Sequence, residues 1–135
     1  MSLIEDQSFP KVEHLKSRKQ IDELFKGGKS FFVHPVKVFW NISKLNNATN
    51  IPVTIGVSAS KRNFKKAVDR NRVKRLLRES YRLNKQDLFQ ACEAKQNQLQ
   101  AFFIYVDKSQ PSFENIQSKV KLCLKRLQKI VEDAA

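Results

Sequence analysis

The chain has 135 residues, and 26 lysines and arginines against 13 acidic residues give it a net charge of +13. Hydrophobic residues make up 41% of it, which excludes a disordered basic tail and is enough for one buried core. We therefore expect residues 1–135 to form a single domain. No apolar run approaches the roughly 18 residues of a membrane span. The first residues carry acids and lack the apolar stretch of a secretory signal, so we expect a cytoplasmic protein.

The few cysteines and histidines indicate neither a disulfide framework nor a metal site. Cys92 and Cys123 are expected to be reduced thiols. His14 and His34 have no cysteine or histidine neighbour at metal-ligand spacing. A small chain this basic is instead typical of proteins that bind nucleic acid or an acidic membrane surface.

The first half of the chain predicts an arm, a helix and strands. Residues 1–12 show no periodicity and are expected to be a loose arm. A helix follows, predicted by a capping box, an apolar face and a terminating glycine pair: Ser17 with Gln20, then Ile21, Leu24 and Phe25, then Gly27 and Gly28. Alternation predicts a strand over residues 36–42, and residues 31–33 suggest a shorter one. Residues 43–50 have the composition of a loop, and residues 51–58 predict another strand.

The second half predicts two longer helices around a buried strand. One helix spans residues 67–84, and the other begins after the N-cap Ser112 and runs toward Glu132. The apolar run within residues 100–107 predicts a strand covered on both faces. Residues 85–99 fit either an extension of the preceding helix or a glutamine-rich loop. The order α-β-β-α-β-α, with one further short strand possible, predicts an α+β fold with a single sheet of about four strands packed by helices.

Positive charge is concentrated in residues 61–85, where eleven basic residues stand against only Asp69 and Glu79. On a helix, Val73, Leu77 and Tyr81 share an apolar stripe with Leu76 and Ser80. The opposite arc carries a nearly unbroken polar row: Asn71, Lys74, Arg75, Arg78 and Arg82. Such a row neutralises phosphates, and the planar guanidinium of arginine suits two-point phosphate contacts.

Two other interpretations of this row are weaker. An ordinary solvated helix face mixes charge signs, and this one hardly does. A basic amphipathic helix can also lie on a membrane or bind an acidic partner, but the apolar stripe is needed for the core.

Phe39 is a second candidate contact, because it lies between Lys37 and Asn41 on the polar face of its strand. It is either a stacking platform for unpaired bases or a residue covered by a helix, and Phe25 either meets it or belongs to the core. The chain has no Walker loop, GxGxxG or supported Ser/His/Asp or Cys/His set, and its acids are scattered. We therefore expect no catalytic or metal-binding side chains.

The sequence AVDRNRVKRLLRE at residues 67–79 resembles the RNR motif of the bacterial ribonuclease P protein subunit. The resemblance covers most of the chain. It includes Leu24-Phe25 with Gly28-Lys29-Ser30, residues 55–58 and 60–62, residues 102–106, and the helix after Ser112. It implies a fold like the second domain of a small-subunit ribosomal protein, with a left-handed βαβ crossover.

The resemblance also implies the partners and the chemistry. A large RNA subunit hydrolyses precursor tRNA with Mg²⁺ held mainly by the RNA and its substrate. One protein monomer binds that RNA and grips the single-stranded 5′ leader between the first helix and the sheet, and no membrane is involved. Leader removal then produces the mature 5′ end of the tRNA.

The matching positions and the pattern of charge together give two sets of expected site residues. The RNA-binding set is Lys61, Arg62, Lys65, Lys66, Arg70, Asn71, Arg72, Lys74, Arg75, Arg78 and Arg82. The leader-cleft set is Ile21, Phe25, Lys37 and Phe39. The chain departs from the family at Ile21, where phenylalanine is usual, and in the turn over residues 61–66, which has no glycine and about one extra residue.

Three rival functions remain open from the sequence. The first is a basic structural protein that binds ribosomal RNA without a role in cleavage. The second is a protein nuclease that acts without RNA, against which the missing carboxylate cluster argues. The third is a membrane-surface protein.

Overall fold

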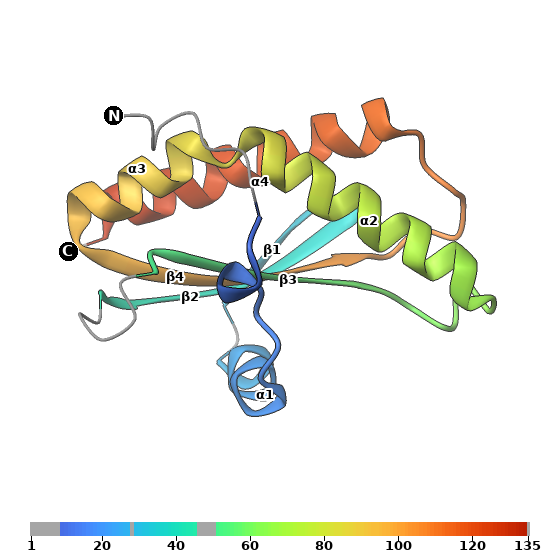
Figure 1. The fold of residues 1–135 in the computed structure, drawn as a ribbon, viewed down its shortest axis with the longest axis horizontal. Helices are drawn as coiled ribbons and strands as arrows, with labels where there is room; N and C mark the ends of the chain where they lie inside the picture. Colours follow the sequence, from blue (N-terminus) through green and yellow to red (C-terminus); the bar gives the residue numbers. More distant parts are fainter. Residues whose placement is uncertain (1–8, 28, 46–50, 135) are drawn as a thin grey trace.

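A computed structural model describes residues 9–27, 29–45 and 51–134 and builds one mixed sheet between two layers of helix (Figure 1). The strands are β1 (Ser30–Val33), β2 (Val36–Lys44), β3 (Val53–Ala59) and β4 (Asn97–Tyr105). Their spatial order is β1-β2-β4-β3. β2 is antiparallel to both β1 and β4, whereas β3 and β4 run parallel. The predicted α+β fold with a four-stranded sheet is confirmed.

The helices divide unequally between the two faces of the sheet. The three longer ones, α2 (Ala67–Asn84), α3 (Gln86–Lys95) and α4 (Phe113–Asp133), lie on one side, and α1 (Arg18–Lys26) lies alone on the other (Figure 1). α1 and α4 begin as predicted, because the hydroxyls of Ser17 and Ser112 accept hydrogen bonds from the backbone N–H groups of Gln20 and Asn115. α1 ends at Gly27, as the glycine pair indicated.

The main core fills the space between the sheet and the three longer helices. Alternation along β2 sends Val36 and Val38 to this side, where the register pairs Val38 with Phe103 of β4. The apolar stripe of α2 closes on them with Leu77 and Tyr81, both fully buried. Packing of this stripe against the sheet leaves the opposite face of α2 outside.

Several predicted boundaries need correction. β2 continues through Ser43 and Lys44, which were expected in a loop, because both pair with the first residues of β4. The residues left open, 85–99, form α3 and then the start of β4, which begins at Asn97 and not near residue 100. Gln96 makes the turn between them with a left-handed φ of 55°. The left-handed crossover from β3 to β4 stays a prediction from the resemblance.

The arm is held against the molecule from residue 9 onward, and residues 1–8 lie outside the described part. The ring of Phe9 stacks 4.0 Å from His14 and 5.2 Å from Tyr81. The buried ammonium of Lys85 pairs with Glu13 at 2.9 Å. His14 then joins β3 through a bridge to Ile55. Residues 9–15 therefore lead the chain across the sheet edge to α1, and Lys85 serves packing rather than the basic surface.

Both cysteines are thiols in the described part of the chain, as expected. Cys92 and Cys123 are buried and free, and burial raises the pKa of each thiol to about 12, so both stay protonated at neutral pH. No helix among the described residues is long and apolar enough to cross a membrane.

Candidate nucleic-acid interface

The outward face of α2 carries the predicted row of polar and cationic side chains. Asn71 and Arg75 are exposed, and Lys74 and Arg78 are half-buried along the same face. Among the described residues, Arg75 and Arg78 form no ion pair and donate no side-chain hydrogen bond, so their donors face outward. We call Asn71, Lys74, Arg75 and Arg78 the α2 row.

The turn before α2 adds four exposed cations, Lys61, Arg62, Lys65 and Lys66, which we call the basic turn. Its buried anchor is Phe64, whose ring lies 6.0 Å from that of Tyr105. Arg70 closes the turn, because its Nη1 donates to the carbonyl oxygens of Phe64 at 2.9 Å and Lys65 at 3.1 Å. No residue of the turn has a positive φ, which explains why it needs no glycine.

Two arginines of the expected RNA-binding set, Arg72 and Arg82, contact other parts of this chain in the structure. Nη1 of Arg72 donates to the side chain of Gln110 and, at 3.1 Å, to the carbonyl oxygen of Pro111. Arg82 forms an ion pair with Glu79 at 2.8 Å, which raises the pKa of Arg82 and lowers that of Glu79. Arg72 thus joins α2 to the segment before α4, a contact that its place in the motif does not reveal.

Because Arg72 joins α2 to the segment before α4, we expect it to position the helix and not to contact phosphates. Arg72→Met is expected to lower the free energy of unfolding by about 1–2 kcal/mol, because it removes charge-assisted hydrogen bonds. At temperatures where the variant stays folded, the salt dependence of RNA binding is expected to stay near that of the wild type. Urea unfolding and binding titrations at several salt concentrations measure both. A stable variant with a shallower salt dependence would instead make Arg72 a phosphate contact.

On the other face of the sheet, α1 and the strands bring together a cluster of aromatic side chains. The ring of Phe25 lies 4.7 Å from Phe39 and 5.4 Å from Phe102. Lys37 holds its ammonium 5.1 Å from the centre of the Phe39 ring. Phe25 is 39% exposed, and Phe39 is half-buried. The helix therefore covers part of the Phe39 ring and leaves part of it accessible, and its stacking on bases stays a prediction.

Ile21 packs on the same cluster, so the structure brings together all four predicted cleft residues. Phe102 also packs in this cluster, although the sequence analysis did not include it among the cleft residues. A uniformly apolar run does not show which residues face which side, but the pairing of Phe102 with Phe39 does. We call Ile21, Phe25, Lys37, Phe39 and Phe102 the α1 groove, after the cleft that the family resemblance implies between α1 and the sheet.

Gly56 on β3 shapes the groove by its lack of a side chain. A Cβ atom at this position would lie 2.5 Å from Cδ2 of Phe102. The ring of Phe102 can lie flat over β3 only because residue 56 is glycine. The α1 groove lies on one face of the sheet, and α2, which carries the α2 row on its outward side, packs against β3 on the other face.

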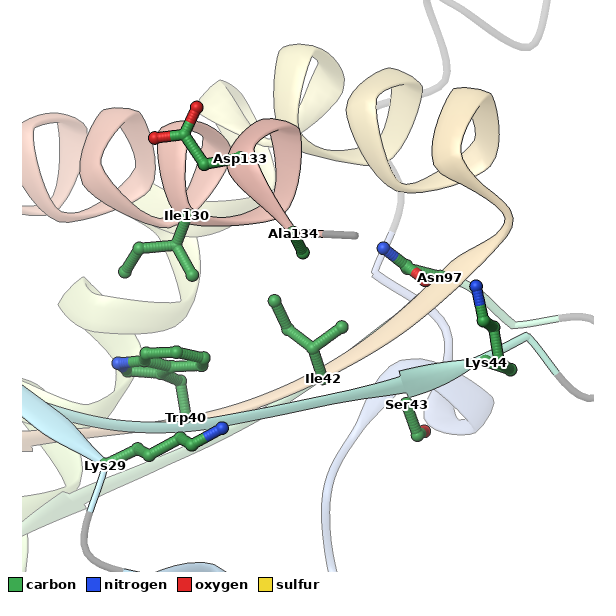
Figure 2. A pocket seen from close by; sticks show the side chains of 9 residues that line it. All are labelled: Lys29, Trp40, Ile42, Ser43, Lys44, Asn97, Ile130, Asp133 and Ala134. Carbon is green, nitrogen blue, oxygen red and sulfur yellow. The ribbon is translucent and has the colours of Figure 1, made fainter.

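A hollow of about 580 Å³ opens between the sheet and the end of α4, on the side of the longer helices (Figure 2). Trp40 and Ile42 of β2 face Ile130 near the end of α4, and Lys29 lies 5.2 Å from the centre of the Trp40 ring. The lining mixes Lys44 with the carboxylate of Asp133. This hollow continues neither the α2 row nor the α1 groove, and we assign it no part in RNA binding.

Comparison with known proteins identifies the family. A family model described as Ribonuclease P matches residues 9–128, which include both surfaces. The chain belongs to the bacterial ribonuclease P protein component family. It is therefore a protein subunit of ribonuclease P, the endoribonuclease that processes tRNA.

Two ribonuclease P protein components from other bacteria match this chain over most of their length. The component of Porphyromonas gingivalis is 35% identical over 87% of this chain and 84% of its own. That of Chlorobium phaeobacteroides is 35% identical over 89% and 88%. The RNase P protein of Staphylococcus aureus shares the fold, with a TM-score of 0.65 and 21% identity, covering 84% of this chain and 94% of that one.

Membership decides between the functions that the sequence left open. A ribonuclease P protein component associates with ribonuclease P RNA. Membership therefore favours the RNA-processing subunit over a structural protein that binds ribosomal RNA, a nuclease acting alone or a membrane-surface protein. The resemblance stated from the RNR motif is confirmed. The contacts made by individual residues are a separate question.

Proposed function

We propose that this subunit binds ribonuclease P RNA through the α2 row and the basic turn, and the 5′ leader of precursor tRNA in the α1 groove. The observation that carries the proposal is the pair of surfaces on either side of β3, one cationic and one aromatic. A cationic row neutralises phosphates and releases their counterions, which gives affinity and orientation without reading sequence. Aromatic rings beside a lysine hold unpaired bases by stacking.

The two surfaces together favour binding of precursor tRNA over binding of mature tRNA. Mature tRNA has lost the leader, so only the precursor gains free energy from stacking on Phe25 and Phe39. The groove therefore raises substrate affinity without strengthening product binding. Arg62 and the rest of the basic turn lie at the end of β3, where they would meet phosphates of RNA passing from one surface to the other.

Hydrolysis in this proposal belongs to the RNA subunit. The described residues contain no group of three histidine, cysteine or carboxylate side chains that could hold a metal ion, so Mg²⁺ would be bound mainly by the RNA and the substrate. The protein would act as one monomer per RNA, as a single domain, and in the cytoplasm. Its net charge of +13 would replace part of the Mg²⁺ otherwise needed to bring two RNAs together.

Reconstitution tests this function directly. The purified protein, its cognate ribonuclease P RNA and a precursor tRNA are mixed at low Mg²⁺, and release of the 5′ leader is followed. Cleavage is expected to require both protein and RNA at low Mg²⁺, and RNA alone to regain activity as Mg²⁺ is raised. A protein that binds the RNA and never promotes cleavage would contradict the proposal.

A further inference from the structure

The hollow between the sheet and the end of α4 combines apolar walls with a few polar groups (Figure 2). Trp40 and Ile42 of β2 form one side, and Ile130 of α4 faces them. Trp40 is the only tryptophan of the chain, and its side chain is half-buried here. Small-molecule sites are mostly apolar with a few placed polar groups, and a hollow of about 580 Å³ has the size of such a site.

Asn97, the first residue of β4, supplies an independent sign of a missing ligand. It lines the hollow and is only 3% exposed, as are the buried residues Ser80 and Lys85 or nearly so. The Ser80 hydroxyl donates to the carbonyl oxygen of Leu76 at 2.8 Å, and the Lys85 ammonium pairs with a carboxylate. The side chain of Asn97, by contrast, makes no hydrogen bond to any residue that the structure describes. Buried polar groups are usually bonded, so this carboxamide is available to a ligand in the hollow.

The charges around the hollow favour an anion. Lys44 pairs with Asn97 in the register of β2 and β4, so the cation and the carboxamide stand on the same side of the sheet at one end of the hollow. Lys29 is exposed and holds its ammonium 5.2 Å from the centre of the tryptophan ring. Figure 2 shows the carboxylate of Asp133 pointing away from the apolar walls, and it pairs with Lys129 at 3.8 Å. The described lining therefore offers cations and N–H donors to a negative group.

We propose that this hollow binds a small organic anion in which a flat ring is joined to a terminal carboxylate or phosphate. The ring packs against Trp40 between Ile42 and Ile130, because aromatic surfaces bury best on one another and on apolar walls. Trp40 and Lys44 are four residues apart on one strand, a span of about 14 Å that the lysine side chain shortens. The anionic group of an extended ligand then meets Lys44 and the carboxamide N–H of Asn97.

Two kinds of molecule share this chemistry, aromatic carboxylic acids and nucleoside monophosphates. The hollow lies apart from the α2 row and the α1 groove, so the inference does not rest on the RNA contacts proposed above. It assigns the protein a ligand that is free in solution and not part of an RNA chain.

The single tryptophan provides the readout for the test. The full-length protein is titrated with phenylbutyrate and with adenosine monophosphate, and the indole N–H signal of Trp40 is followed by NMR. At least one of the two is expected to shift this signal to saturation, with a dissociation constant of about 1 mM or lower, as the size of these ligands allows. Inorganic phosphate lacks the ring and adenosine lacks the anion, so each is expected to bind about tenfold more weakly or less.

Variants of the lining test the assigned groups. Asn97→Leu with Lys44→Met removes the anion-binding end and should weaken binding about tenfold, the effect of losing a charge-assisted hydrogen bond. Ile130→Phe fills the apolar part without removing a polar group and should abolish the shift. The matched control Lys121→Met removes the same charge from an exposed position on α4 and should bind as the wild type does. Lys44→Met alone replaces the double variant if thermal unfolding shows that variant to be unfolded.

The outcomes that overturn the inference are specific. One is that neither phenylbutyrate nor adenosine monophosphate shifts the indole signal to saturation. Another is that the folded variants at residues 44 and 97 bind as tightly as the wild type. Binding of inorganic phosphate as tight as that of the ring-bearing anions would show that only charge is recognised, and it would also defeat the proposal.

Discussion

Replacing Arg75 and Arg78 together by alanine is expected to weaken binding of ribonuclease P RNA about 100-fold. Both side chains lie on the outward face of α2 and make no ion pair among the described residues, so their guanidinium groups are available to phosphates. A hydrogen bond to a charged group contributes about 1.5 kcal/mol, and two such losses correspond to about two orders of magnitude in affinity. Titrations of labelled RNA with the protein over a series of salt concentrations measure the change.

The salt dependence identifies the cause. Each phosphate contact that is lost reduces the slope of log K against log salt concentration by about 1, so the double variant should reduce it by about 2. Lys121→Ala with Lys125→Ala on α4 is the matched control, because it removes the same charge from exposed positions elsewhere. An unchanged slope in the arginine variant, or an equal change in the lysine variant, would show that the row makes no specific phosphate contacts.

Phe39→Ala is expected to weaken binding of precursor tRNA to the holoenzyme about tenfold and to leave binding of mature tRNA unchanged. Stacking of one base on an aromatic ring contributes about 1–3 kcal/mol, and only the precursor has a leader to stack. Phe39 also contacts Phe25 and faces Phe102 across β2 and β4, so the variant will lose some stability. Affinities are therefore compared at a temperature where thermal unfolding shows the variant to be folded.

Two further variants isolate the aromatic contribution. Phe39→Leu retains apolar packing under α1 and should lose most of the same affinity, because it cannot stack. Phe113→Ala, at the first turn of α4, removes a half-buried ring from the opposite layer and should affect neither RNA. Equal losses for precursor and mature tRNA in the Phe39 variants would make this residue a packing element and not a leader contact.

Local patterns predicted the helices of this fold well. The bounds of α2 match the expected residues 67–84, because an apolar stripe at helical spacing and a polar row opposite it are both local properties of the sequence. The capping serines at α1 and α4 were equally predictable from the sequence. Each hydroxyl bonds a backbone N–H only three residues away, so the cap needs no tertiary contact.

Residues 85–99 could not be assigned from the sequence for a physical reason. The division between α3 and β4 depends on the left-handed turn at Gln96, a residue type with no strong preference for that conformation. The early start of β4 depends on pairing with β2, whose last residues resemble a loop in composition. Hydrogen bonds between distant strands overrode local preference at both places.

In the candidate site, too, some features follow from the local sequence and others only from the tertiary structure. The sequence by itself determined that the chain folds around one core, that α2 carries a row of cations facing outward, and that the protein belongs with ribonuclease P. Only the tertiary structure decided that Arg72 binds Gln110 and Pro111, that Arg82 pairs with Glu79, and that Phe102 joins Phe25 and Phe39. Charge and periodicity are properties of neighbouring residues, whereas the partners of a long side chain depend on which distant segments the fold brings within a few ångströms of it.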